Sequence, residues 1–241
     1  MDYLNYGKKD QQKQQGFDNQ VQLTKDDFNF GDLSQQEAPP QATPQIQDEL
    51  IQLFPTPLLI CPCPFDYSME LEWINKQSTG KKNISGNDSK IYNHQSEDTF
   101  ILDNSEMSRV RQFIELKIKE FAVNVMGSDS EMVITQSWLN KNMKGESHHE
   151  HEHPNSIISG VWYPKIHEQL PPICFRQNNP RGVILSIKNR NNFNSSKFLL
   201  PLKMGELILF PSNLAHSVPS NHLDEERISL SFNTWAKGNL G

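Results

Sequence analysis

Four of the chain's eight histidines fall within six residues: His148, His149, His151 and His153. Side chains two residues apart lie on the same side of an extended segment, because strand side chains alternate. On this basis His149, His151 and His153 share one side, and His148 and Glu150 share the other. Two ligands from one strand, closed by a third from a distant strand, would hold a metal ion and leave its other positions open for chemistry.

The third ligand must come from downstream, where His167, His216 and His222 are available. We favour His216, because it follows the strongly apolar, strand-like run 206–210 and its proline stop. His222 lies in a polar turn, and His167 has no partner nearby in sequence.

A candidate anion receptor begins eleven residues after His216. The segment 227–233 reads RISLSFN, so that Arg227, Ser229 and Ser231 lie on one face of a strand. An arginine with a serine two residues on presents a fork of donors plus a hydroxyl, which suits a carboxylate. In the alternative, Arg227 is structural and pairs with an acid of the preceding turn (Asp224, Glu225 or Glu226).

The elements that must position these residues are mainly strands. A helix is predicted from Asn104 or Ser105 to Gly127, because apolar residues recur there at intervals of three and four. A proline-punctuated edge strand at 53–60 and a short helix after Asp66 precede it, and the polar stretch 78–97 resembles a long loop. Short β-rich runs follow, at 132–139, 157–163, 173–175, 183–187, 198–202, 206–210 and 227–235. This order predicts a mainly β fold, a sandwich or jelly roll buttressed by N-terminal helices.

The ordered motifs HxH, PxxxISGVWYP, GELILFPSxLxHxV and RISLSFN resemble the iron(II)/2-oxoglutarate-dependent oxygenases. Within that superfamily they are similar to the oxygenase group common in tailed phages and marine bacteria. The resemblance covers residues 54 to 235 and implies a double-stranded β-helix. It further implies three Fe(II) ligands (His151, His153 and His216) and four contacts to 2-oxoglutarate (Arg227, Ser229, Asn140 and Tyr163).

The activity that the resemblance implies uses Fe(II), 2-oxoglutarate and O2. Oxidative decarboxylation of 2-oxoglutarate to succinate would be coupled to hydroxylation of an unidentified substrate, and no side chain beyond the metal site need act as a catalyst. A small molecule or a peptide is the expected substrate class.

One residue departs from the superfamily pattern. His153 stands where most members have a carboxylate, and a neutral ligand leaves more positive charge on the metal. Two other pairings stay open: His149 with His151, or His148 with Glu150, which restores a carboxylate. Jelly-roll dioxygenases with three histidines do not use 2-oxoglutarate, so such a dioxygenase is one alternative function. A non-catalytic metal-binding accessory or virion-associated protein is the other.

The composition of the chain bears on its cellular compartment, its partners and the bounds of its domain. The chain has only three cysteines, which argues against a disulfide scaffold and for the cytoplasm, or the host cytoplasm if a phage encodes the chain. The net charge of -6 over the 241 residues argues against a general nucleic-acid binder. No apolar run suits a membrane span, and duplex nucleic acid is not an expected partner. Residues 1–48 are acidic and rich in glutamine, which predicts a disordered tail that is either a solvated leader or a docking segment for a protein partner. The oxygenase domain would occupy 49–241, with Trp138, Trp162 and Trp235 in its core.

Overall fold

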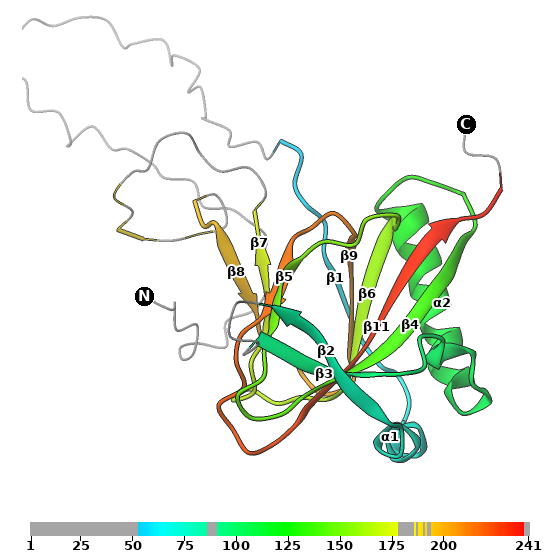
Figure 1. Cartoon of the computed structure of the whole chain (residues 1–241). Coiled ribbons are helices and arrows are strands. Elements are labelled where there is room, and N and C mark those ends of the chain that lie inside the picture. The colour runs from blue at the N-terminus through cyan, green and yellow to red at the C-terminus, as the bar shows by residue number, and fades with distance from the viewer. Residues whose placement is uncertain are drawn as a thin grey trace, which may run out of the picture. The chain divides into compact units, whose positions relative to one another are not determined.

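The computed structural model describes residues 53–85, 91–177, 186, 188, 189, 191 and 194–238 (Figure 1). The expected tail at 1–48 lies outside these residues, and so does the strand expected at 183–187, apart from residue 186. The predicted mainly β architecture is confirmed: two antiparallel sheets form a jelly roll.

The larger sheet has seven strands in the order β1-β9-β6-β11-β4-β3-β2. Their bounds are β1 Leu59–Pro62, β2 Thr79–Ser85, β3 Ile91–Ser96, β4 Met132–Asn142, β6 Ile158–Lys165, β9 Glu206–Pro211 and β11 Arg227–Ala236. The expected edge strand is present as β1. The long β11 pairs with β4 on one side and with β6 on the other, so it is the central strand of the sheet.

The smaller sheet has four strands in the order β5-β10-β7-β8. Their bounds are β5 His148–His151, β7 Ile173–Arg176, β8 Lys197–Leu200 and β10 His216–Val218. Two of the four, β5 and β10, are built from the histidine segments and have no strand-like apolar pattern. This sheet faces the inner side of the larger one.

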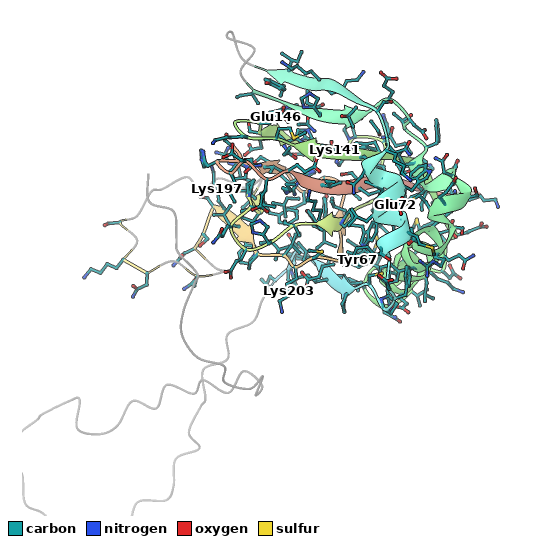
Figure 2. All side chains as sticks on the ribbon, turned by 90° about the horizontal axis from the view of Figure 1, so that it is seen from below. Tyr67, Glu72, Lys141, Glu146, Lys197 and Lys203 are labelled. Carbon is teal, nitrogen blue, oxygen red and sulfur yellow. The ribbon has the colours of Figure 1, made fainter. Side chains whose placement is uncertain are left out.

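Two helices cover the outer side of the larger sheet: α1 (Ser68–Asn75) and α2 (Ser108–Asn124). In Figure 1, α2 lies beside β4 and β11, away from β5, β7 and β8, and Figure 2 shows Glu72 of α1 and Lys197 of β8 on different sides of the domain. Within the described residues, no helix is both long and apolar enough to cross a membrane.

Strand alternation divides the apolar residues into two cores. The outward-facing Trp162, Leu209 and Phe232 pack with α2 in one core, and the inward-facing Tyr163 and Phe210 belong to the core between the sheets. Gly160 must be a glycine, because an added Cβ would lie 2.2 Å from the Phe232 ring. The same alternation sends the polar residues of β11 inward, as the sequence predicted.

The prediction of a long loop at 78–97 is wrong. Its described residues form two strands, β2 and β3, and β3 pairs with β4 through His94 and Gln95. Both strands are polar on both faces, so they lack the alternation that identifies a half-buried strand, and pairing with β4 holds them in the sheet.

Candidate metal and co-substrate site

Three histidines meet where β5 and β10 pair. His151 ends β5 and lies opposite His216, the first residue of β10, and His153 follows two residues after β5. Each of the three offers a ring nitrogen, and these nitrogens all lie within 4.8 Å of one another. We call this group the histidine end of the site.

Two of these rings are oriented by backbone carbonyls. The Nδ1 atoms of His151 and His216 lie 2.9 Å from the carbonyl oxygens of His149 and Leu214. Because a carbonyl only accepts, each Nδ1 must carry the proton, so that each Nε2 has a free lone pair. Burial lowers the pKa of His151, lowers that of His153 to about 4 and lowers that of His216 to about 3. All three rings are therefore neutral at pH 7, as metal binding requires.

The sequence analysis placed His149 on the same side of the strand as His151 and His148 on the opposite side, and this prediction is wrong. The four residues of β5, His148 to His151, lie opposite the three residues of β10, His216 to Val218, which is a β-bulge. The extra residue reverses the alternation. His148 consequently lines the pocket and stacks on His151, with ring centres 4.3 Å apart, while His149 is not among the pocket-lining residues.

Glu150 does not accompany the histidines. Its carboxylate accepts hydrogen bonds from Arg176 of β7 at 2.9 and 3.1 Å, on the exposed side of the smaller sheet. The pairing of His148 with Glu150 as metal ligands therefore has no support in the geometry, whereas His151, His153 and His216 converge.

Arg227 lies at the other end of the same pocket. It is 2% exposed, donates to Asn142 at 3.4 Å and to Ser229 at 3.2 Å, and lies over the Tyr163 ring with its Cζ 5.1 Å from the ring centre. The acids of the preceding turn pair with other residues, since Asp224 contacts Lys144, Glu225 contacts His167 and Glu226 contacts Lys165. Arg227 thus has no acidic partner among the described residues.

The arginine end, formed by Arg227, Ser229, Asn142 and Tyr163, holds donors that the described residues do not satisfy. Arg227 Nε and Asn142 Nδ2 are buried without a hydrogen-bond partner among these residues, and the buried Tyr163 hydroxyl has only the Arg227 guanidinium beside it. Burial raises the pKa of Tyr163 to about 12, although the Arg227 guanidinium opposes the shift, so the hydroxyl keeps its proton. Unpaired buried donors beside an uncompensated cation are costly unless an anion binds there. This end therefore fits a carboxylate.

All four residues expected to contact 2-oxoglutarate line the pocket. Asn140 differs from the other three in that both ends of its side-chain amide are already hydrogen-bonded. Asn140 donates to Ser231 at 3.0 Å and accepts from the fully buried Asn93 at 2.8 Å. Its neighbour Asn142, which the sequence analysis missed, is the asparagine opposite Arg227. The run Asn140-Lys141-Asn142 carried the signal, because residues two apart share a strand face.

The three tryptophans that were expected in the core lie in different environments. Trp162 is in the core as expected, but Trp235 is 39% exposed, which contradicts the prediction for that residue. Trp138, 8% exposed, belongs to neither core; it lines the pocket and meets the His153 ring edge-on at 5.8 Å. The pocket's empty volume, including space open to solvent, is about 350 Å³, near the lower limit for ligand sites, about 300 Å³.

Residues 136–233 match a family described as "Putative 2OG-Fe(II) oxygenase". No curated protein sequence matches the chain. One similar solved structure is an oxidoreductase of the 2OG-Fe(II) oxygenase family from Burkholderia pseudomallei, with 13% sequence identity and a TM-score of 0.52. A second is the non-heme alpha ketoglutarate dependent epimerase SnoN from nogalamycin biosynthesis, with 12% identity and a TM-score of 0.53. A third is HygX from Streptomyces hygroscopicus with nickel, 2-oxoglutarate and hygromycin B bound, with 8% identity and a TM-score of 0.52. The matches cover 73%, 74% and 74% of this chain and 84%, 78% and 82% of the respective structures.

At such identities the structural similarity shows the fold. Fold and pocket define a jelly-roll protein with three convergent histidines facing a buried arginine. The matched segment contains all of these residues, so this part of the chain is similar to the 2OG-Fe(II) oxygenase family in sequence as well as in fold.

Proposed function

We propose that the chain is an Fe(II)- and 2-oxoglutarate-dependent dioxygenase that hydroxylates a small molecule or a peptide. In this proposal His151, His153 and His216 hold the metal, and Arg227 with Ser229 binds the far carboxylate of 2-oxoglutarate. Asn142 and Tyr163 supply further donors at the arginine end, and Asn140 lines the wall between the two ends.

The buried Arg227 carries this proposal. A metal-binding accessory protein has no use for an unpaired guanidinium in its metal pocket, and a dioxygenase that works without 2-oxoglutarate would need one only for a substrate that itself carries an anionic group. In this chain the guanidinium and the three imidazoles line one pocket. That arrangement suits a ligand with an anionic group at one end and metal-binding oxygens at the other.

When bound, Fe(II) and 2-oxoglutarate activate O2, and oxidative decarboxylation to succinate and CO2 supplies the oxidising power for hydroxylation. The residues of the chain provide position and exclusion of water. The carbonyls of residues 149 and 214 orient two ligand rings, and the guanidinium orients the co-substrate. Trp138 and Val161 make part of the wall apolar, which protects the reacting centre from solvent.

The test is the visible charge-transfer band that forms when 2-oxoglutarate chelates Fe(II) in the anaerobic protein. We expect the band with the native chain, and we expect Arg227→Ala to raise the dissociation constant of 2-oxoglutarate at least about tenfold, since a hydrogen bond to a charged group is worth about 1.5–3 kcal/mol. Arg176→Ala, which removes a surface arginine of β7, is the control and should leave the constant unchanged.

Two results would contradict the proposal. If Fe(II) binds and no band forms, the third histidine has changed the chemistry, and the dioxygenase without 2-oxoglutarate or the binding protein takes precedence. If the band forms equally well with Arg227→Ala, the arginine has another role.

A further inference from the structure

The pocket contains a fourth imidazole that the proposed metal site does not use. His148 lies on β5, three residues before His151, and the β-bulge turns its ring into the pocket. The two rings stack, with centres 4.3 Å apart and planes inclined by 27°. The sequence pattern alone places His148 on the opposite side of the strand, away from the site.

His148 is not arranged as a metal ligand. Imidazole nitrogens bind metals through lone pairs in the ring plane, at about 2.0–2.1 Å for zinc. Two stacked rings with planes inclined by only 27° hold their lone pairs in separate planes, an arrangement that does not favour binding of one ion by both rings. The convergent group within the described residues is accordingly His151, His153 and His216, without His148.

The ring of His148 also has no structural partner. No hydrogen bond within the described residues engages either of its nitrogens, whereas His151 and His216 are both held by carbonyls. A neutral imidazole always carries one N–H donor and one acceptor nitrogen. His148 lines the same pocket as the three convergent histidines and Arg227.

We propose that His148 is a co-substrate-binding residue, and that its ring N–H donates a hydrogen bond to the carboxylate of 2-oxoglutarate nearest the histidine end. This inference rests on the proposed function. Arg227 and Ser229 then bind one carboxylate of the co-substrate and His148 the other. Among the described residues, every side chain that lines the pocket is neutral or cationic, so a second carboxylate meets no acidic group of theirs there.

The competing explanation is that His148 only packs against His151 and supports its orientation. Two substitutions separate the roles. His148→Phe keeps an aromatic ring that can stack on His151 and removes the donor. His148→Gln loses the stacking ring and keeps an N–H at a similar reach.

The experiment titrates 2-oxoglutarate into anaerobic protein loaded with Fe(II) and follows the charge-transfer band, after Fe(II) affinity has been measured separately for each variant. For His148→Phe we expect at least about a fivefold weaker affinity for 2-oxoglutarate and an Fe(II) affinity within about twofold of native. For His148→Gln we expect substantial recovery of the affinity for 2-oxoglutarate. His167→Gln, at a surface histidine paired with Glu225, is the control and should match the native protein.

The inference is overturned if His148→Phe binds 2-oxoglutarate like the native chain. It is also overturned if the glutamine variant is the weaker of the two and loses Fe(II) as well, because packing against His151 would then be the role of the ring. Failure of the proposed function looks different: the native protein itself would show no band.

Discussion

The two faces of β11 are equally buried and opposite in character. Toward α2, the face presents Ile228, Leu230 and Phe232, each 0% exposed and packed in the outer core. Toward the smaller sheet it presents Arg227, Ser229, Ser231 and Asn233, none of them more than 9% exposed.

The difference lies in how each face is satisfied. The apolar face is complete, because packing is all that its side chains require. The polar face is satisfied at Ser231, which accepts from Asn140, and unsatisfied at Arg227, whose Nε has no partner in the part of the chain that the structure describes. A buried polar face that the protein itself leaves unsatisfied indicates a ligand, and it costs stability until that ligand binds.

The largest effect is expected on the apolar face. Phe232→Ala should lower the free energy of unfolding by about 3–5 kcal/mol, because a fully buried ring leaves a cavity in the core. Urea denaturation measures this loss. Phe198→Ala is the control, since Phe198 on β8 is 49% exposed, and it should cost far less. Equal losses would mean that the outer core is not what stabilises β11.

The polar face should respond in the opposite way. Arg227→Met removes an uncompensated buried charge, so the free energy of unfolding without ligand should stay the same or rise. Thermal unfolding checks the second half of the comparison: adding 2-oxoglutarate to the Fe(II)-loaded protein should raise the Tm of the native protein and should raise that of the variant much less. A marked loss of stability in the ligand-free variant would make Arg227 a structural residue.

The same contrast explains how much could be predicted from the sequence. A continuous apolar run predicted β9 and recurrence at intervals of three and four predicted α2, and alternation predicted β11, because one face of that strand must be apolar. For the same reason the amino-acid sequence alone was enough to assign Arg227, Ser229 and Ser231 to one face. The convergence of His151, His153 and His216 was expected from the family resemblance, and the geometry agrees with it.

What could not be predicted depends on pairing between strands. The β-bulge that brings in His148 is a property of the register between β5 and β10, which local sequence does not determine. The hairpin of β2 and β3 is polar on both faces, so the sequence pattern could not indicate that it belongs to the sheet. Its contribution to the site, Asn93, was missed with it.

Asn93 permits a smaller test, at the border between the satisfied and the unsatisfied parts of the polar face. Asn93→Ala leaves the buried Asn140 carbonyl oxygen without its donor, which should cost about 1–3 kcal/mol of stability. The freed Asn140 amide should also weaken 2-oxoglutarate binding severalfold, with Fe(II) affinity unchanged, as anaerobic titration would show.

The control for Asn93 lies one step further from the pocket. Asn83 donates to Asn93 at 2.8 Å and has a φ of 57°, so Asn83→Gly removes the outer hydrogen bond without straining the backbone. We expect it to leave 2-oxoglutarate affinity within about twofold of native. If both variants weaken binding equally, the hairpin as a whole supports the site rather than the contact with Asn140.

The smallest effect is expected just before β11, where the acids that might have neutralised Arg227 lie. Glu226 is bound to Lys165 at 3.0 Å, and exposed or half-exposed pairs of this kind are worth about 0–1 kcal/mol. Glu226→Gln should therefore leave both stability and 2-oxoglutarate affinity nearly unchanged in the same urea and titration measurements. A tenfold change in affinity would mean that Glu226 acts on Arg227 after all, and the guanidinium would then no longer be free to select a carboxylate.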